Sequence, residues 1–473
     1  LVRHDPLPND SIKPYVKSRI ITDERGNKTV HDYDSSLNEI KITYADGTSI
    51  SRTWHEKFAL PLTETNEKGI VTAYEYDAKG NLLKLIEAKG TADERSTSYT
   101  YDEYGQIKTK TTGASAAGNT VLATTSYDYD QYGNITQITD AEGNVTKYSD
   151  YDALGNAQTI TDARASALPV NYQYFWKNTY DAAGNLLSHL DPYSKGEVYT
   201  YTKNGDLETF TSAGNSKTIV NTNAIGKPTA VIDANNKAST AEYDKTGRLI
   251  ITTDANGNKK QINYDAIGRI IRKVDGEGNT TQFSHSDGLL RSTQYPRYKE
   301  LFEYDSNNRI KQVIQKANNR DHISNLNYDP LDNIISSKDA QDNTTRYEYD
   351  SLNRVKKIIN ADGGATEFTY DARDNILQVK DSNGNLTSYN YRKDNRLLTE
   401  NKNSSNQRKY IYDENGLITS SINGLEEKIN FEFNRSNKLV KTKIYANKEH
   451  LVPIKVINYN FNEKYLFTGW NQQ

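Results

Sequence analysis

Histidine side chains are the first place to look for metal binding or acid–base catalysis in this sequence. The seven histidines include no pair with a metal-ligand spacing: His4, His31, His55, His189, His285, His322 and His450. His55-Glu56 resembles the start of a zinc-protease helix, but that motif needs a second histidine four residues after the first, and none is there. We expect His55 to be a surface residue of a strand.

Carboxylates crowd around many short turns and raise the question of calcium. Asp128 to Gly133 resembles the start of a calcium loop, which needs alternating oxygen ligands and a terminal glutamate. The repeat described below accounts for these aspartates without an ion, and a few weak calcium sites remain the alternative. The chain has no cysteine, serine-nucleophile elbow, Walker loop or dinucleotide fingerprint. We therefore expect no enzymatic activity, no cofactor and no bound metal in this segment.

Two features of the sequence could relate the chain to carbohydrates: glycosylation sequons and rows of tyrosine. Six Asn-x-Thr sequons begin at Asn27, Asn134, Asn144, Asn279, Asn343 and Asn385. The repeat produces them, because a turn that ends in asparagine is followed by a strand that opens with threonine. Rows of tyrosine can stack on sugar rings. Most of them should be cross-strand ladder residues, and glycan binding is the alternative.

Composition limits the class of protein. The 59 basic and 62 acidic residues leave a net charge of -3, which argues against nucleic-acid or anionic-membrane binding. Hydrophobic residues make up only 35% and the mean hydropathy is -0.86, yet 35 tyrosines on a regular spacing argue against disorder. We expect a thin folded layer without a thick core.

No apolar run reaches the ~20 residues of a membrane span. The chain has no methionine and starts at Leu1 without a leader or other targeting signal, so we expect it to be a segment of a longer polypeptide.

An aromatic strand that ends in Tyr-Asp returns about every 21 residues, which identifies a repeat protein. Thr345, Tyr347 and Tyr349 share one face of such a strand, and Arg346 and Glu348 share the other. Because alternation with period two recurs along the chain, we predict β-strands rather than helices. The 21-residue step links two series: Tyr180, Tyr201, Thr222, Tyr243, Tyr264 and His285, then Tyr328, Tyr349, Tyr370, Tyr391, Tyr412 and Phe433.

The fourth residue after each tyrosine is almost always glycine, asparagine or aspartate. These residues tolerate positive φ, so we predict a left-handed turn position there. A second strand and a second turn such as Asp254 to Asn258 complete each unit. The repeat positions on which this interpretation rests are Tyr76, Gly80, Tyr101, Gly105, Tyr151, Gly155, Tyr180, Gly184, Tyr243, Gly247, Tyr264, Gly268, Tyr349, Tyr370, Tyr412 and Gly416.

About 19 such units predict roughly 38 antiparallel strands in a ribbon about 180 Å long. Strand twist must coil such a strip, either packing its tyrosine face on neighbouring coils or turning one face toward a cavity. We expect stability to be collective, because one unit buries too little apolar surface to offset its ordering entropy. The expected organisation is a non-repeat or capping segment over 1–32, a repeat array over 33–448, and a degenerate terminal repeat or the start of a following segment over 449–473. Irregular stretches at 111–125, 163–174 and Tyr295-Pro296 predict loops or bends.

The units that begin at Tyr180, Tyr243 and Tyr264 resemble the YD repeat of Rhs proteins, which also occurs in the BC components of Tc toxins, in teneurins and in wall-associated contact-inhibition toxins. The resemblance covers nearly all of residues 33–433. It implies an all-β fold, in which an array of antiparallel hairpins is wound as a β-strip into a curved or hollow, cocoon-like shell that encloses a C-terminal toxin domain. The partners implied are that cargo domain, the remaining shell segments of the same polypeptide and secretion-apparatus proteins, and the implied location is secreted or cell-surface.

The resemblance has a gap, and it leaves an alternative. Bacterial members close the shell with a Pro...Asp-Pro-x-Gly-Leu motif for self-cleavage, which Asp5-Pro6, Asp191-Pro192 and Asp329-Pro330 do not match. A strip of ~3,600 Å² would close around an inner radius of about 12 Å, whereas a 100-residue domain needs about 17 Å, so we expect only part of a shell. The alternative is an adhesive or carbohydrate-binding array on a cell surface.

Overall fold

The computed structural model describes residues 17–115, 121–402, 406–461 and 467–472. Within these ranges the chain forms 41 strands of one antiparallel sheet, the α-helix α1 (Ala163–Ser166) and the 3-10 helix η1 (Val170–Tyr172). Each strand pairs with the strand before it and the strand after it, as the first and last pairs illustrate. The sheet is therefore one continuous meander, and the predicted all-β fold is confirmed.

The strands alternate with two kinds of turn. Turns after even-numbered strands follow the Tyr-Asp motif and are called YD turns; turns after odd-numbered strands are called return turns. The strands are β1 (Ser18–Thr22), β2 (Lys28–Tyr33), β3 (Glu39–Thr43), β4 (Ser49–Trp54), β5 (Pro61–Thr65), β6 (Val71–Tyr76), β7 (Leu82–Lys89), β8 (Arg95–Tyr101), β9 (Ile107–Ser115), β10 (Ala123–Tyr129), β11 (Ile135–Thr139), β12 (Val145–Tyr151), β13 (Ala157–Thr161), β14 (Trp176–Tyr180), β15 (Leu186–Leu190), β16 (Gly196–Tyr201), β17 (Leu207–Thr211), β18 (Lys217–Thr222), β19 (Pro228–Ile232), β20 (Ala238–Tyr243), β21 (Leu249–Thr253), β22 (Lys259–Tyr264), β23 (Ile270–Val274), β24 (Thr280–Ser286), β25 (Leu289–Gln294), β26 (Lys299–Tyr304), β27 (Ile310–Ala317), β28 (Arg320–Tyr328), β29 (Ile334–Lys338), β30 (Thr344–Tyr349), β31 (Val355–Ile359), β32 (Ala365–Tyr370), β33 (Ile376–Lys380), β34 (Leu386–Tyr391), β35 (Leu397–Lys402), β36 (Asn406–Tyr412), β37 (Ile418–Ile422), β38 (Lys428–Phe433), β39 (Leu439–Tyr445), β40 (Lys455–Phe461) and β41 (Phe467–Gln472).

The two faces of the strip differ as the alternation predicts. In β30 the side chains of Tyr347 and Tyr349 are half-buried, whereas Arg346 and Glu348 are exposed. No large side chain among the described residues is fully buried. The chain exposes 28520 Å², while a compact protein of its 53.5 kDa would expose roughly 18,000 Å². The predicted thin layer is therefore confirmed.

A β-bulge accompanies the YD turns and curves the sheet. In the β30/β31 hairpin, Glu348 pairs with Lys357 and Tyr349 pairs with Val355, so Lys356 has no partner in the ladder. The same shift recurs in the other YD hairpins except β12/β13, for example in β2/β3, β20/β21 and β38/β39. A bulge bends its strand and increases the local twist. Because the bulges fall beside one edge of the strip, its curvature accumulates in one sense.

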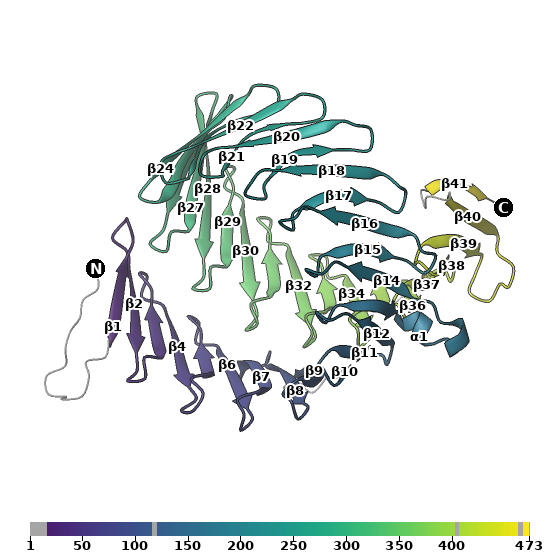
Figure 1. Ribbon diagram of the computed structural model, residues 1–473. Coiled ribbons are helices and arrows are strands. Elements are labelled where there is room, and N and C mark those ends of the chain that lie inside the picture. Colours follow the sequence, from purple (N-terminus) through teal and green to yellow (C-terminus); the bar gives the residue numbers. More distant parts are fainter. Residues whose placement is uncertain (1–16, 116–120, 403–405, 462–466, 473) are drawn as a thin grey trace.

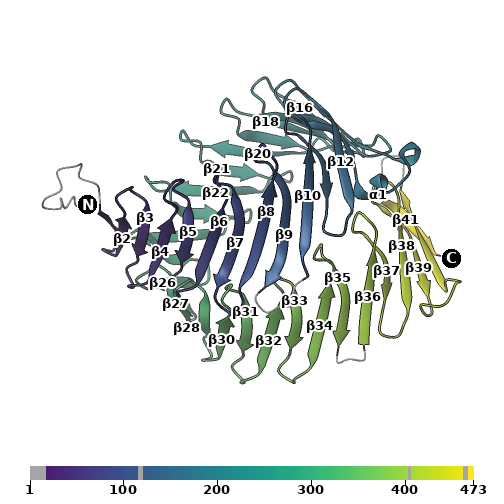
Figure 2. The ribbon, with the colours of Figure 1, turned by 90° about the horizontal axis from the view of Figure 1, so that it is seen from below.

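The strip passes itself once as it coils. Figures 1 and 2 show strands β1–β9, coloured purple to blue, beside strands β26–β34, coloured teal to green, although the two sets are far apart in sequence. We call residues 18–195 the first coil, residues 299–445 the second coil and residues 196–298 the connecting strands. The two coils touch edge to edge, because return turns of the first coil contact YD turns of the second. Of the two packings expected for a coiled strip, the tyrosine face does not stack on the neighbouring coil; turn contacts join the coils instead.

Two of the irregular stretches, at 163–174 and Tyr295-Pro296, lie in connections between strands. The insertion at 163–174 contains α1 and η1 and forms the return turn between β13 and β14. Tyr295 and Tyr298 flank the return turn between β25 and β26, with their rings stacked at 4.4 Å. The stretch 111–125 is strand on both sides, and residues 116–120 lie outside the described part of the chain.

The sheet also extends beyond the expected limits of the repeat array. Strand β1 and most of β2 precede residue 33, and β40 and β41 follow residue 448. The division at 32 and 448 remains a prediction. No helix in the described ranges is long and apolar enough to cross a membrane.

Candidate functional site

The YD turn is a hydrogen-bonded unit built around its aspartate. In the turn after β6, Asp77 Oδ1 accepts hydrogen bonds from the backbone N–H groups of Lys79 and Asn81, both at 2.8 Å. Its Oδ2 accepts a third from the Asn81 side chain at 2.8 Å. This side-chain hydrogen bond lowers the pKa of Asp77 below its usual value, because it stabilises the carboxylate. Gly80 closes the turn at φ 90°, where a side chain would be strained.

Other turns repeat this geometry, which explains the crowded aspartates. The carboxylate accepts the same pair of backbone hydrogen bonds in YD turns and return turns, as at Asp34, Asp130, Asp152, Asp181, Asp140, Asp254, Asp275, Asp339 and Asp381. These carboxylates serve the turns in which they lie. Within the described ranges, no group of three or more histidine, aspartate or glutamate side chains is arranged to hold a metal ion.

Arginine at the last turn position links one repeat to the next. Arg354 Nε donates to Asp350 Oδ2 at 2.7 Å within its own turn. Its Nη1 donates to the backbone carbonyl of Asp371, in the following YD turn, at 2.9 Å. The guanidinium also lies 4.5 Å from the ring centre of Tyr370, a cation–π distance. Arg309 makes the corresponding contacts with Asp305, Asp329 and Tyr328.

The hydroxyl of the repeat tyrosine ties each unit to the one before it. Tyr349 donates to the backbone carbonyl of Ile334, the first residue of β29, at 2.9 Å. Burial raises the pKa of Tyr349, so the phenol stays protonated and keeps donating. The same bond is made by Tyr76 to Pro61, Tyr101 to Leu82, Tyr243 to Pro228, Tyr264 to Leu249, Tyr370 to Val355 and Tyr412 to Leu397.

Every predicted repeat residue lies either at the end of an even-numbered strand or in the YD turn that follows it. The tyrosines end even-numbered strands, and the glycines occupy the left-handed position of the following YD turn: Tyr76, Tyr101, Tyr151, Tyr180, Tyr243, Tyr264, Tyr349, Tyr370 and Tyr412, with Gly80, Gly105, Gly155, Gly184, Gly247, Gly268 and Gly416. Asn308, Asp332, Asn353, Asp374, Asn395 and Asn437 hold positive φ at the same position, as predicted.

The unit after β4 departs from the motif and keeps the contacts. Trp54 replaces tyrosine, and its indole Nε1 donates to the carbonyl of Glu39 at 3.0 Å. His55 replaces aspartate, and its Nδ1 accepts the backbone N–H of Lys57 at 3.1 Å. The prediction that His55 lies on a strand was therefore wrong: it caps a turn, because imidazole nitrogen can accept the hydrogen bond that the carboxylate accepts elsewhere.

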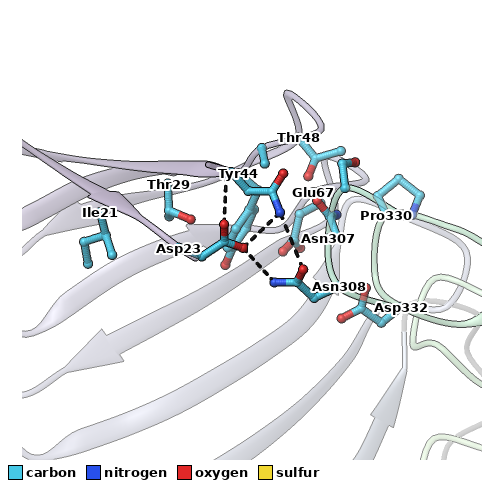
Figure 3. A pocket seen from close by; sticks show the side chains of 13 residues that line it. Ile21, Asp23, Thr29, Tyr44, Thr48, Glu67, Asn307, Asn308, Pro330 and Asp332 are labelled. Atoms are coloured by element: carbon cyan, nitrogen blue, oxygen red, sulfur yellow. Dashed lines mark hydrogen bonds between the residues drawn. The ribbon is translucent and has the colours of Figure 1, made fainter. Parts of the chain in front are cut away.

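The seam is the line along which return turns of the first coil meet YD turns of the second. At one end Arg25 Nη1 donates to the carbonyl of Asp305 at 2.7 Å and to Asn308 Oδ1 at 2.8 Å. Asn308 in turn donates to Asp23 Oδ2 at 3.0 Å and lowers the pKa of Asp23 to about 2. Figure 3 shows Asp23 and Asn308 pointing toward each other from the two coils. They line a cavity of about 300 Å³.

Charged pairs continue the seam toward its middle. Lys68 Nζ lies 2.5 Å from Asp329 Oδ2, and Arg95 Nη1 lies 2.6 Å from Asp374 Oδ1. Burial alone would raise the pKa of Asp374, but Arg95 and Arg354 bring it below its usual value. Such pairs contribute little when exposed, so the strength of the seam depends on their number and partial burial.

Several hydrogen bonds join the two coils at the inserted helix. Asp162 caps α1 by accepting from the backbone N–H of Ala165, which fixes Arg164 over the second coil. Arg164 Nη2 donates to the carbonyl of Asn434 at 2.7 Å and to Asn437 Oδ1 at 2.8 Å. Its backbone N–H donates to the Asn415 side chain at 2.8 Å. Nearby, Ser436 Oγ donates to the buried carboxylate of Asp191 at 2.5 Å.

Comparison with known families identifies these units. The family model described as RHS Repeat matches residues 129–167, 223–259, 328–365 and 349–386. The chain is an RHS-repeat protein. A comparison of the sequence with curated proteins gave no match.

Solved structures share the fold of this RHS-repeat protein. A Tc holotoxin pore from Photorhabdus luminescens matches 94% of this chain and 34% of its own at a TM-score of 0.63 with 10% identity. The TcdB2-TccC3 crystal structure matches 94% of this chain and 32% of its own at a TM-score of 0.63 with 12% identity. The RHS-repeat chain spans about a third of the length of those chains. At these identities the likeness establishes the fold alone.

Sequence reasoning located the repeat tyrosines and the YD turns, but it missed the seam. Arg95 and Arg164 look like ordinary surface residues in the sequence, because their acceptors lie 279 and 273 positions further along the chain. No spacing rule connects them, since the pairing depends on how many strands complete one coil. The interruption of the repeat at 163–174 was the available signal, because this insertion contains Arg164, which binds the second coil.

Proposed function

We propose that this RHS-repeat segment is a structural part of an Rhs-type polymorphic toxin: a stretch of β-shell wall that helps to enclose a C-terminal toxin domain for delivery to competitor or host cells. The observation that supports it best is the seam. A strip that joins its own successive coils along their edges makes a continuous wall from a single layer, and a wall is the element that an enclosure needs.

The direction of the seam supports one way in which the wall would continue. The return-turn edge of the first coil binds the YD edge of the coil that follows it. A further coil would therefore add its YD turns to the return turns of the second coil, such as those at 339–343 and 381–385. Partners under this proposal are the cargo domain, the other shell segments of the same polypeptide and secretion-apparatus proteins. We propose export of the whole protein, with its catalysis confined to a domain outside this segment.

Protease protection of the cargo tests the proposal in the full-length protein that contains this segment. We expect the toxin domain to resist digestion in the parent protein and to become cleavable in Arg164→Ala, which weakens the seam. Arg272→Ala is the control, because Arg272 lies in the connecting strands and its guanidinium donates hydrogen bonds to Asn263 and Thr280 of the neighbouring strands. Ready digestion of the cargo in the parent protein would count against enclosure, and equal resistance in the parent and Arg164→Ala proteins would show that this contact does not hold the wall closed.

A second candidate is an adhesive or carbohydrate-binding array on a cell surface. Exposed aromatic rings on the YD edge of the first coil favour it, since Tyr104 and Tyr132 are 82% and 81% exposed. The two candidates differ in what flanks the segment. A wall anchor or a membrane span in the full-length gene product would favour adhesion, and a shell-closing motif followed by a toxin domain would favour enclosure.

A further inference from the structure

One position of the YD turns differs systematically in exposure along the strip. We call it the edge position: the residue immediately before the left-handed residue, such as Tyr104 before Gly105. Its backbone N–H donates to the turn carboxylate, as that of Tyr104 does to Asp102 Oδ1 at 2.9 Å. The turns after β4 and β24 have other lengths and lack this position. Because the turn geometry repeats, differences in exposure arise from what lies against the edge.

The edge positions of the second coil are covered. These residues are all half-buried or buried: Asn307, Leu331, Leu352, Arg373, Asp394, Asn415 and Ser436. Return turns of the first coil provide the cover. Ser436 Oγ donates to Asp191, in the return turn before β16. Asn307 donates to Asp46, in the return turn before β4. The edge position is therefore the place where a YD turn receives the coil before it.

The same position is exposed in the first coil and the connecting strands. Its residues there are Ser36, Lys79, Tyr104, Tyr132, Leu154, Ala183, Asn204, Ile225, Thr246 and Ile267. Leu154 gives a direct comparison, because it is 60% exposed, whereas Leu331 and Leu352 are half-buried at the same turn position. The difference follows the seam, since within the described ranges no coil lies against these turns.

The large apolar members of this set form what we call the apolar row. They are between 60% and 82% exposed: Tyr104, Tyr132, Leu154, Ile225 and Ile267. The first three lie in successive YD turns, which two strand spacings place about 10 Å apart. Apolar side chains gathered along one edge are typical of a protein interface. The row therefore continues, on the other edge of the first coil, the kind of contact that the seam makes.

The spacing of the seam contacts indicates which segment would cover the row. Side-chain hydrogen bonds across the seam join residues 245 to 285 positions apart, and the return turn comes earlier in the chain. The same separation places the return turns that would cover Tyr104, Tyr132 and Leu154 before Leu1. This chain spans about a third of the length of the matched Tc toxin chains, so a protein of this kind has room for such a segment.

We propose that the apolar row seats a preceding coil of the same polypeptide, formed by residues before Leu1, whose return turns cover it as those of the first coil cover the second. The inference rests on the proposed wall and specifies which residues receive the preceding coil. It also assigns Tyr104 and Tyr132 to a contact within the protein, where their rings would be covered.

Hydroxyl-radical footprinting with mass spectrometry tests the proposal in the full-length protein that contains this segment. The labelling of each residue in the native protein is divided by its labelling in urea. We expect the ratio for Leu154 to match those for Leu331 and Leu352 within about twofold, because the three leucines would share one environment, and we expect Tyr104 and Tyr132 to be protected as well. Ratios near one at Leu154 and both tyrosines would overturn the proposal and leave the two rings free for the second candidate function.

Leu154→Asp tests the contact from the other side. In the full-length protein it should speed hydrogen exchange at least about tenfold in return turns before Leu1, because a carboxylate would be desolvated against them. Ile411→Asp is the control, since Ile411 is 51% exposed but lies within strand β36 and not at an edge position. Exchange before Leu1 should stay at the parent level in this control. Unchanged exchange in Leu154→Asp would overturn the proposed contact.

These measurements are separate from the protease protection of the cargo. A covered row with a digestible cargo would support the preceding coil and count against enclosure. An exposed row with a protected cargo would overturn the preceding coil and leave enclosure standing.

Discussion

Removing the side chain of Arg164 should open the seam locally and leave the strip folded. In Arg164→Ala the second coil loses hydrogen bonds from a charged donor to the carbonyl of Asn434 and to Asn437 Oδ1, at 2.7 and 2.8 Å. The variant also loses the bond from Arg164 Nε to the Tyr174 hydroxyl at 2.9 Å. Each bond to a charged group contributes about 1.5–3 kcal/mol. The two bonds that cross the seam, taken near the lower end of that range because the side chain is 19% exposed, give an expected loss of about 3–4 kcal/mol.

Hydrogen exchange followed by mass spectrometry measures this loss where it occurs. A loss of about 3–4 kcal/mol corresponds to local opening between about one hundred and one thousand times more frequent. We expect faster exchange in the YD turns at 413–417 and 434–438 and unchanged exchange in the connecting strands β18–β23. Arg164→Lys should fall between the parent and Arg164→Ala, because lysine keeps the charge and lacks the planar fork.

Two results would refute the reasoning. Unchanged exchange at 413–438 in Arg164→Ala would show that the contacts of α1 do not hold the second coil. A uniform increase across all strands would show that the strip unfolds as a whole, so that the seam is not a separate contact. Arg272→Ala, which removes a guanidinium from the connecting strands, should leave exchange at 413–438 at the parent level.

Three further predictions concern the turns and the ladder. Asn308→Ala should raise the pKa of Asp23 from about 2 toward 3.8, as measured by carbon-detected NMR titration of the carboxyl, and an unchanged titration would contradict this. Because the pKa of Asp23 is lower in the folded than in the unfolded protein, its stabilisation is complete above pH 4 and is lost as the pH falls through 2. Tyr349→Phe should lower the free energy of unfolding by about 1 kcal/mol in urea denaturation, through the lost bond to the preceding repeat, and a neutral result would show that the hydroxyl is satisfied by water as well. Gly105→Ala should destabilise by about 1 kcal/mol because Gly105 has φ 85° and only strain is added there, whereas Asn353→Gly, at the same turn position, should be neutral or slightly stabilising.

The local features of the fold were predictable because each depends on residues fewer than about twenty positions apart. Tyr347 and Tyr349 share a face because side chains of a strand alternate. Positive φ at Asn308 and Asn353 followed from the residue types that tolerate it, and the structure confirms both. The role of His55 was mispredicted, since the sequence pattern alone did not show that imidazole replaces the turn carboxylate.

The positions of the bulges could not be predicted from the repeat pattern. The alternation of Tyr347, Glu348 and Tyr349 gives the strand and its faces, but it does not show that Lys356 leaves the ladder. In β12/β13, Ser149 pairs with Thr159 and Tyr151 pairs with Ala157, so Asp150 also leaves the ladder, and the sequence shows this only as a one-residue change in tyrosine spacing.

The sequence by itself determined that this chain is an array of hairpins with one aromatic and one polar face, because those properties arise within a single 21-residue unit. Only the tertiary structure decided that return turns of one coil bind YD turns of the next and that Arg95 and Arg164 hold them together. The physical reason is accumulation: a small bend at each bulge is repeated over many strands before the strip meets itself, so the partners of a seam residue depend on the curvature of everything between them.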